Sequence, residues 1–120
     1  MTDRLKVEEQ EIVDISRECA QVLSEKKGLD IVIMDLRCVN SYLDYFLIAT
    51  GNSRIHCRSM ARDAEKFIHS KGLRQRNKPD YESGWIILDF NELIVHIFTH
   101  ELREYYQLER LWGDATEITY

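Results

Sequence analysis

The chain has 120 residues and a formal net charge of −5 at pH 7, with 44% hydrophobic and 31% charged residues. These proportions are typical of a soluble globular protein, and they exclude an intrinsically disordered chain or a membrane-embedded one. The length supports one core, so we expect a single domain over residues 1–120, with loose ends at about 1–8 and 116–120. The polar start lacks an apolar signal core, from which we expect a cytoplasmic protein without membrane attachment.

Charge is distributed unevenly along the sequence. Residues 51–78 hold eight Lys or Arg against Asp63 and Glu65, which leaves −11 for the rest of the chain. Such an asymmetry can steer association with a charged partner, although it does not determine the fold.

The first half of the chain predicts a helix, two strands and a second helix. Apolar residues at three- and four-residue spacing from Ile12 to Leu23 predict an amphipathic helix, which Lys26-Lys27-Gly28 should end with the glycine as a left-handed cap. Residues 29–36 and 45–50 read as strands that pair antiparallel. Ser53 or Asn52 is expected to cap a long helix that reaches about Ser70.

The second half predicts a hairpin followed by a helix. Residues 73–83 form a polar connection that could include one short edge strand, because its single proline suits an edge. Two β-branched and aromatic runs, 85–88 and 93–98, flank a short polar link, which is typical of a tight hairpin. A helix should begin near His100 or Glu101. We therefore expect an α+β fold with a mixed four- to five-stranded sheet and packed helices.

Metal and disulfide chemistry find little support in the residue pattern. The three cysteines are widely spaced and odd in number, so we interpret them as reduced thiols that fill the core. His96 and His100 are four residues apart with Glu101 and Glu104 nearby, but His96 should lie on a strand and His100 on the next element, so the two rings should not share a face. Hydrogen-bonded or surface histidines are the simpler interpretation.

The turn Gly51-Asn52-Ser53 precedes the long helix, where backbone amides could bind an anion. Plain N-capping by a hydroxyl or amide is more probable, since the turn matches no phosphate-binding motif. Asp63 and Glu65 lie two apart on the predicted helix, which points them away from each other, so we do not expect them to share a magnesium ion.

Large apolar groups are concentrated after the hairpin. Tyr105, Tyr106, Leu108, Leu111 and Trp112 exceed what one buried helical stripe needs, so some of them should be exposed. Exposed aromatic residues beside charged ones have the composition of a protein interface.

Two blocks of sequence resemble a known family. Asp-Tyr-Phe-Leu-Ile-Ala-Thr-Gly at 44–51 is one, and the other is the series Gly-Trp, Leu-Asp-Phe, Val-His-Ile-Phe, Leu-Arg-Glu-Tyr-Tyr and Leu-Glu-Arg-Leu-Trp-Gly-Asp-Ala between 84 and 115. In this order they are similar to the ribosomal silencing factor family, RsfS, also called Iojap-like. The resemblance implies a nucleotidyltransferase-like fold without its catalytic residues, and hence no enzyme, cofactor or metal.

The resemblance also implies a partner and a mode of action. It implies binding to the large ribosomal subunit through ribosomal protein L-fourteen, steric blocking of the small subunit, and repression of translation. We expect six residues to contribute to that surface, with His96 the weakest candidate: Trp85, Asp89, His96, Phe98, Tyr105 and Glu109. Formation of a homodimer by the free protein is left open.

A basic stripe on the long helix supports an alternative. Arg54, Arg58, Arg62 and Lys66 recur every four residues and could contact RNA, which would make the protein an RNA-binding or ribosome-assembly factor. A solvated helix face gives the same spacing, and a minor rRNA contact beside a protein interface is compatible with both.

Overall fold

The computed structural model describes residues 2–120, with side chains described from Glu9 onward. Its elements in chain order are α1 (Thr2–Glu25), β1 (Leu29–Asp35), β2 (Tyr45–Gly51), α2 (Arg54–Ser70), β3 (Trp85–Asp89), β4 (Leu93–Thr99), α3 (His100–Tyr106), α4 (Leu108–Leu111) and β5 (Thr116–Ile118).

The strands form one five-stranded mixed sheet in the order β3-β4-β2-β1-β5. β2 and β4 run parallel, and the other neighbouring strands run antiparallel. The predicted α+β fold with a mixed sheet is confirmed, as are the antiparallel pairing of β1 with β2 and the β3–β4 hairpin. The parallel contact between β2 and β4 joins these two halves of the chain.

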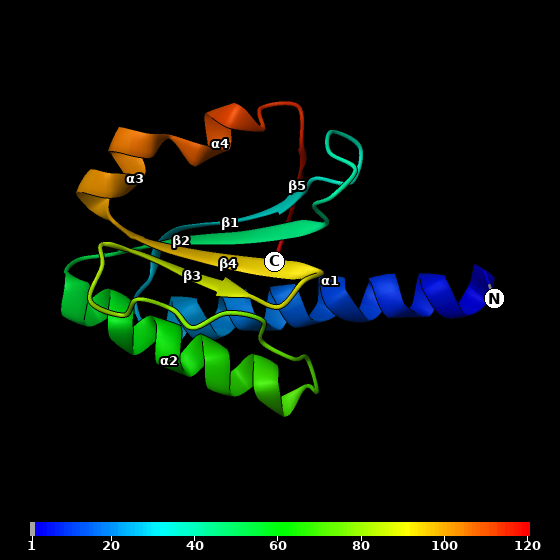
Figure 1. Ribbon diagram of the computed structural model, residues 1–120, viewed down its shortest axis with the longest axis horizontal. Coiled ribbons are helices and arrows are strands. Elements are labelled where there is room, and N and C mark those ends of the chain that lie inside the picture. Colours follow the sequence, from blue (N-terminus) through cyan, green and yellow to red (C-terminus); the bar gives the residue numbers. More distant parts are fainter. Residues whose placement is uncertain (1) are drawn as a thin grey trace.

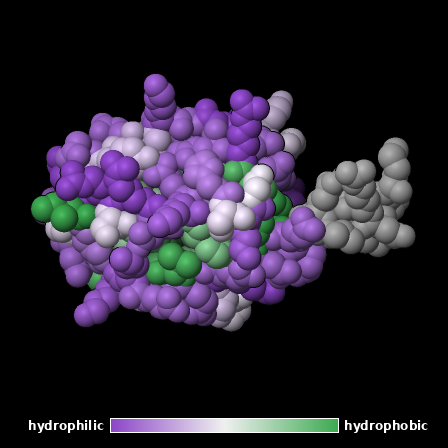
Figure 2. Space-filling model, turned by 90° about the horizontal axis from the view of Figure 1, so that it is seen from below, coloured by the Kyte–Doolittle hydropathy of each residue, from purple (hydrophilic) through white to green (hydrophobic). Residues whose placement is uncertain are grey.

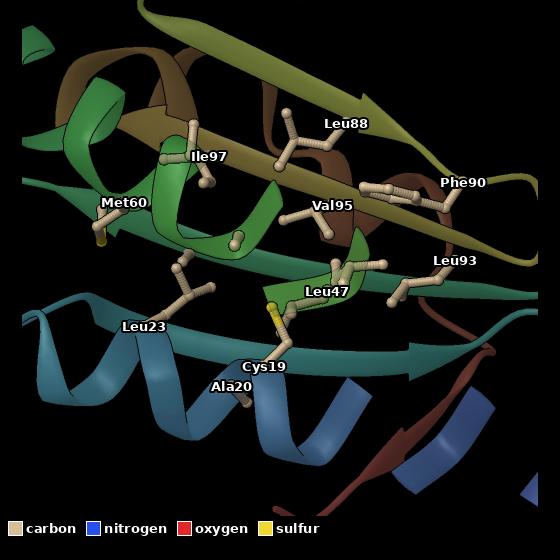
Figure 3. Packing of buried hydrophobic residues seen from close by; sticks show 14 of the residues in the cluster. Cys19, Ala20, Leu23, Leu47, Met60, Leu88, Phe90, Leu93, Val95 and Ile97 are labelled. Atoms are coloured by element: carbon tan, nitrogen blue, oxygen red, sulfur yellow. The ribbon is translucent and has the colours of Figure 1, made fainter. Parts of the chain in front are cut away.

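Helices lie on both faces of the sheet, with α1 and α2 on one face and α3 and α4 on the other (Figure 1). Because side chains alternate along a strand, each strand contributes to two apolar layers. Leu93, Val95 and Ile97 of β4 point into the main core between the sheet and the two long helices. Figure 3 shows Leu23 of α1 and Met60 of α2 on the helix side of the sheet, in the same cluster.

The outer surface of α1 and α2 is mostly hydrophilic, with scattered apolar residues between polar ones (Figure 2). Two ion pairs connect the helices across this surface: Lys26 Nζ lies 2.9 Å from Asp63 Oδ2, and Lys71 Nζ lies 3.1 Å from Glu18 Oε2. Exposed pairs of this kind contribute at most about 1 kcal/mol each, so packing beneath them holds the layer together.

The ends of the long helices are set by local chemistry. Ser53 caps α2 as predicted, since its Oγ accepts a hydrogen bond from the His56 amide at 3.1 Å. At the end of α1 the prediction of a left-handed glycine is wrong, because Lys27 takes that conformation with φ 65°. Gly28 is needed instead for close approach: a Cβ there would lie 2.9 Å from the Leu23 carbonyl oxygen and 3.0 Å from Met60 Sδ.

The C-terminal segment is an ordered strand, so the expected loose end at 116–120 is wrong for residues 116–118. Thr116, Glu117 and Ile118 pair antiparallel with Asp35, Met34 and Ile33 of β1. At the other end, α1 begins at Thr2, well before the residues that predicted it. The rest of the expected loose segment at 1–8, namely Met1 and the side chains of residues 2–8, lies outside the described residues.

The connection between α2 and β3 contains no strand, but it runs along the outer edge of β3. The Asn77 carboxamide accepts a hydrogen bond from the Asp89 amide at 3.0 Å and donates one to the Ile87 carbonyl at 2.8 Å. The Arg76 amide donates to the Asp89 carbonyl at 2.7 Å. Two residues therefore satisfy backbone groups that an edge strand would leave open.

The cysteines divide into two kinds. Cys19 and Cys57 are buried, and burial raises the pKa of the Cys19 thiol to about 12, so it behaves as a small apolar group. Cys38 is exposed, which corrects the expectation that it fills the core. None of the helices in residues 2–120 combines the length and apolar character needed to span a membrane.

Candidate functional site

The sheet face opposite α1 and α2 is only partly covered. Leu102 of α3, with Leu108 and Trp112 of the α4 region, packs over the second apolar cluster, which includes Met34, Phe46, Ile48 and Phe98. Toward β3 the cover ends, and Ile87 and Ile94 of this face are half-buried. An apolar strip with an aromatic border is therefore open to solvent.

The aromatic border is a connected group of rings, which we call the aromatic ladder: His96, Phe98, Trp85, Tyr106 and Tyr105. Trp85 stacks on Phe98 with ring centroids 4.9 Å apart, and it contacts Tyr106, also at 4.9 Å. Tyr105 meets Tyr106 edge-on at 5.0 Å. Exposure increases along the ladder from Phe98 at 0% through Tyr106 at 47% to Tyr105 at 77%. A rigid aromatic series thus leads from the core to the surface.

His96 is a buried histidine in a defined neutral state. The indole Nε1–H of Trp85 donates to His96 Nδ1 at 3.0 Å, and an indole can only donate. Nδ1 is therefore unprotonated, and the ring proton of the neutral imidazole lies on Nε2. Burial lowers the pKa of His96 to about 4, which keeps the ring neutral near pH 7.

The Nε2–H of His96 has no hydrogen-bond partner in the described part of the protein, although it is buried. A buried donor without an acceptor costs about 1–3 kcal/mol. The hydrogen bond from Trp85 engages only Nδ1, and the ring is also packed edge-on against Phe46 at a centroid distance of 4.4 Å. An apolar side chain at this position would avoid the cost but would leave the Trp85 indole N–H without its acceptor, which indicates that the imidazole serves Trp85.

The structure brings together four of the six predicted partner-binding residues, but it does not expose all of them. Trp85 and Tyr105 reach the surface. Phe98 is completely buried and His96 is 5% exposed, so neither offers a partner an accessible surface in this conformation. The interpretation of Phe98 as a contact residue is wrong, because the ring is the floor on which Trp85 lies.

Asp89 and Glu109 lie away from the ladder. Asp89 ends β3, four residues beyond Trp85, which at about 3.3 Å per residue is roughly 13 Å, and its Oδ1 accepts from the Asn91 amide at 2.8 Å. Glu109 on α4 is held by Arg103, whose Nε donates to Glu109 Oε1 at 2.9 Å. The two carboxylates therefore lie at separate places: Asp89 at the end of the edge strand β3, and Glu109 beside Val32 and Met34 of β1.

Sequence reasoning missed two residues that matter here. Tyr106 was part of the aromatic surplus, but nothing in the sequence showed that it would contact Trp85. Arg103 holds α3 to the sheet: its side chain is 11% exposed, and one guanidinium nitrogen donates to Thr50 Oγ1 at 2.8 Å and also to the Asp30 carbonyl. Its partners are far apart in sequence, so no local pattern could reveal it.

The basic stripe on α2 contacts the chain's own segment 80–82. An Arg54 guanidinium nitrogen donates to the Glu82 carbonyl at 3.3 Å, and Arg58 pairs with the Glu82 carboxylate at 2.8 Å. Arg62 lies over the Tyr81 ring, 4.4 Å from its centroid. Lys66 is exposed. Three of the four predicted RNA contacts thus have intramolecular partners, each partly accessible to solvent.

The acidic residues of α2 also have partners in neighbouring segments. Asp63 pairs with Lys26 of the α1 end, and Glu65 accepts a hydrogen bond from the Tyr81 hydroxyl at 2.5 Å. Burial and the Glu65 carboxylate raise the pKa of Tyr81 to about 12, so the phenol remains a donor. These two carboxylates hold neighbouring segments to α2.

Metal ligation has no support in the geometry. Among residues 9–120, whose side chains the structure describes, no three His, Cys, Asp or Glu side chains gather closely enough to hold an ion. At the Gly51–Ser53 turn the Asn52 amide donates to His56 Nδ1 at 2.9 Å, so the helix start is served by the protein's own side chains. His100 is exposed on α3 and lines a charged hollow with Asp30 and Arg103, apart from the buried His96.

Comparison with known proteins agrees with this architecture. The family model described as "Ribosomal silencing factor during starvation" matches residues 9–120. A Bacillus subtilis protein named ribosomal silencing factor RsfS is 32% identical over 102 residues, which cover 84% of this chain and 86% of that protein. The RsfS of Haemophilus influenzae is 34% identical over 94 residues, covering 78% and 92% of the two chains.

Solved structures show the same fold. The crystal structure of a Chromobacterium violaceum protein superimposes with a TM-score of 0.80 at 28% identity, covering 85% of this chain and 86% of that one. A Bacillus halodurans structure gives a TM-score of 0.74 at 26% identity and covers 92% and 99%. With the family model matched over nearly the whole length, this chain belongs to the ribosomal silencing factor family.

Proposed function

We propose that this protein represses translation by binding the large ribosomal subunit at ribosomal protein L-fourteen and excluding the small subunit. The observation that carries the proposal is the open sheet face, where the exposed part of the aromatic ladder borders the half-buried Ile87 and Ile94. Tyrosine and tryptophan are the usual anchors of protein interfaces, because they bury a large area and lose little conformational entropy.

Charge supports the same partner class. The chain outside residues 51–78 carries −11, and Asp89 and Glu109 are among its acidic residues. Acidic groups at the rim of an interface favour encounter with a basic ribosomal protein. Asp89 and Glu109 would contribute at the rim and Trp85, Tyr105 and Tyr106 at the centre.

The action would be steric and would take place in the cytoplasm. A body measuring 44 × 31 × 24 Å at a subunit contact prevents joining by occupancy alone, so inhibition needs no catalytic group. The proposal includes that the protein has no catalytic activity. Nucleotide turnover by the pure protein in the presence of magnesium would contradict it.

The class and the partner can be tested in one experiment. A tagged copy of the chain should recover intact large subunits, but not small ones, from a lysate. Purified ribosomal protein L-fourteen should then bind the chain directly. Recovery of both subunits equally, or of neither, would contradict the proposal.

Side-chain changes test the surface. Trp85→Ala should weaken binding to purified L-fourteen by about 2 kcal/mol, or roughly 30-fold, and Tyr105→Ala and Asp89→Lys by smaller amounts. Glu109→Lys should also weaken binding, but it places a cation beside Arg103 and will lower stability as well. Titration calorimetry gives the affinities, and thermal unfolding shows which variants remain folded.

Matched controls separate the surface from general effects. Asp114→Lys repeats the charge reversal of Asp89→Lys at another exposed site, and Tyr120→Ala repeats the aromatic truncation near the C-terminus. Both should bind as the unmodified protein does. If Asp89→Lys and Glu109→Lys fold and bind with unchanged affinity, the interface has been placed on the wrong face.

A triple substitution in the basic stripe tests the alternative, in which the stripe binds RNA. If the stripe makes only an accessory contact, the effect should be small. Replacing Arg54, Arg58 and Arg62 together by alanine should weaken association with large subunits only about threefold at low salt, and the difference should shrink as salt is raised. Filter binding at several salt concentrations measures this. Loss of all binding at low salt, with the fold intact, would make the RNA contact the main one.

A further inference from the structure

The orientation of Trp85 depends on one directed contact. Stacking on Phe98 and contact with Tyr106 hold the plane of the indole, but a half-turn about its Cβ–Cγ bond keeps that plane and moves Nε1, so plane contacts alone do not fix the orientation. The hydrogen bond from Nε1 to His96 Nδ1 does, because it joins one point on the indole rim to one point on the sheet. The histidine is itself packed in place, since it is buried on a central part of β4 and contacts Phe46.

From these contacts we infer that His96 is a positioning residue for partner binding: it holds the Trp85 indole in the orientation that the ribosomal-protein partner recognises. This inference rests on the proposed function. It adds that one atom, His96 Nδ1, determines the geometry of the docking surface. His96 acts through Trp85 and does not touch the partner. Only the neutral tautomer with Nδ1 free can accept the indole N–H, and burial maintains that state.

The unpaired Nε2–H of His96 distinguishes a role in positioning Trp85 from a role in stability, because a buried donor without a partner lowers stability. Its neighbours on the same face of β4, Ile94 and Phe98, are apolar, and an apolar residue here would leave no buried Nε2–H but also no acceptor for Trp85. The imidazole places an acceptor at the right point on the sheet and leaves its second nitrogen buried without a partner. Stability and binding should therefore respond in opposite directions when the ring is removed.

Three variants of His96 distinguish the acceptor from the shape of the ring. His96→Asn places an amide oxygen where Nδ1 lies, His96→Gln reaches the Nε2 position instead, and His96→Leu offers no polar atom. The asparagine variant should bind purified L-fourteen within about threefold of the unmodified protein, whereas the leucine and glutamine variants should bind roughly tenfold more weakly. The leucine variant should unfold at the same temperature as the unmodified protein or higher.

Two further measurements keep the inference falsifiable if one variant does not fold. In ¹⁵N spectra, with Trp112→Phe used for assignment, the Trp85 indole N–H should exchange with solvent faster in the glutamine and leucine variants than in the asparagine variant. In a Trp85→Phe background, which lacks the N–H donor, the His96 substitutions should change affinity by less than about twofold.

Failure of the positioning role can be distinguished from failure of the proposed function by the binding measurements. If the unmodified protein does not bind L-fourteen, the proposed function fails. If it binds, Trp85→Ala loses binding and folded His96→Leu still binds normally, the positioning role is overturned. Equal weakening by folded asparagine and leucine variants would also overturn it, because the ring shape and not the acceptor would then be responsible.

Discussion

Replacing Phe98 by alanine is expected to lower the free energy of unfolding by about 3–5 kcal/mol. The ring is fully buried in the second apolar cluster, where its removal leaves a cavity beneath Trp85. The variant should also bind its partner more weakly, since the indole loses its floor. Urea unfolding at pH 7 measures the first effect.

Phe98→Leu is the matched control, since it keeps most of the volume and should cost less than about 1.5 kcal/mol. A loss below about 1 kcal/mol for Phe98→Ala would mean that the surroundings collapse around the missing ring. In that event the second apolar cluster would be adaptable, and Phe98 would not act as a rigid floor for Trp85.

Acid should destabilise the fold through His96, by up to about 3 kcal/mol between pH 6.5 and 4. The pKa of the folded-state imidazole is lowered by burial from its ordinary 6.5 to about 4. Between these values the unfolded chain binds a proton that the folded protein does not. Above pH 6.5 the ring is neutral in both states, so its titration does not affect the free energy of unfolding. As the pH falls from 6.5 toward 4, protonation of the unfolded chain lowers the free energy of unfolding progressively.

The comparison with His96→Leu isolates this residue. Carboxylates also titrate in acid; for example, a hydrogen bond from Arg37 lowers the pKa of Asp35, so its contribution too is lost at low pH. Such groups are common to both proteins and cancel in the difference. The free energy of unfolding should thus fall more steeply from pH 6.5 to 4 in the unmodified protein than in the leucine variant, and parallel curves would contradict the burial of a neutral histidine.

Local elements of the fold could be predicted from the sequence, whereas its long-range joins could not. The β3–β4 hairpin and the Ser53 cap of α2 are determined by neighbouring residues, and both predictions are confirmed. The parallel pairing of Tyr45–Gly51 with Leu93–Thr99 has no local signature, because each strand would look the same beside another neighbour. The break between α3 and α4 at Gln107, with φ 46°, was missed because no glycine or proline marks it.

The candidate site follows the same division. Trp85 and Tyr105 were predicted as contact residues from resemblance and composition, and the structure leaves both accessible to solvent. Burial of Phe98 could not be foreseen, since alternation along β4 gives its face but not what covers that face. The engagement of the basic stripe by Tyr81 and Glu82 depends on how the connecting segment folds back, which charge spacing alone does not reveal.

The Asn77 contacts along β3 restrict how this protein can associate with others. An edge strand with free amide and carbonyl groups is a template for backbone pairing with a second chain, the first step of edge-to-edge aggregation. Here the carboxamide occupies the Asp89 amide and the Ile87 carbonyl, so a foreign strand would have to displace it before it could pair. Recognition through this side of the molecule must then depend on side chains, which select among partners, rather than on the backbone, which any extended chain could match.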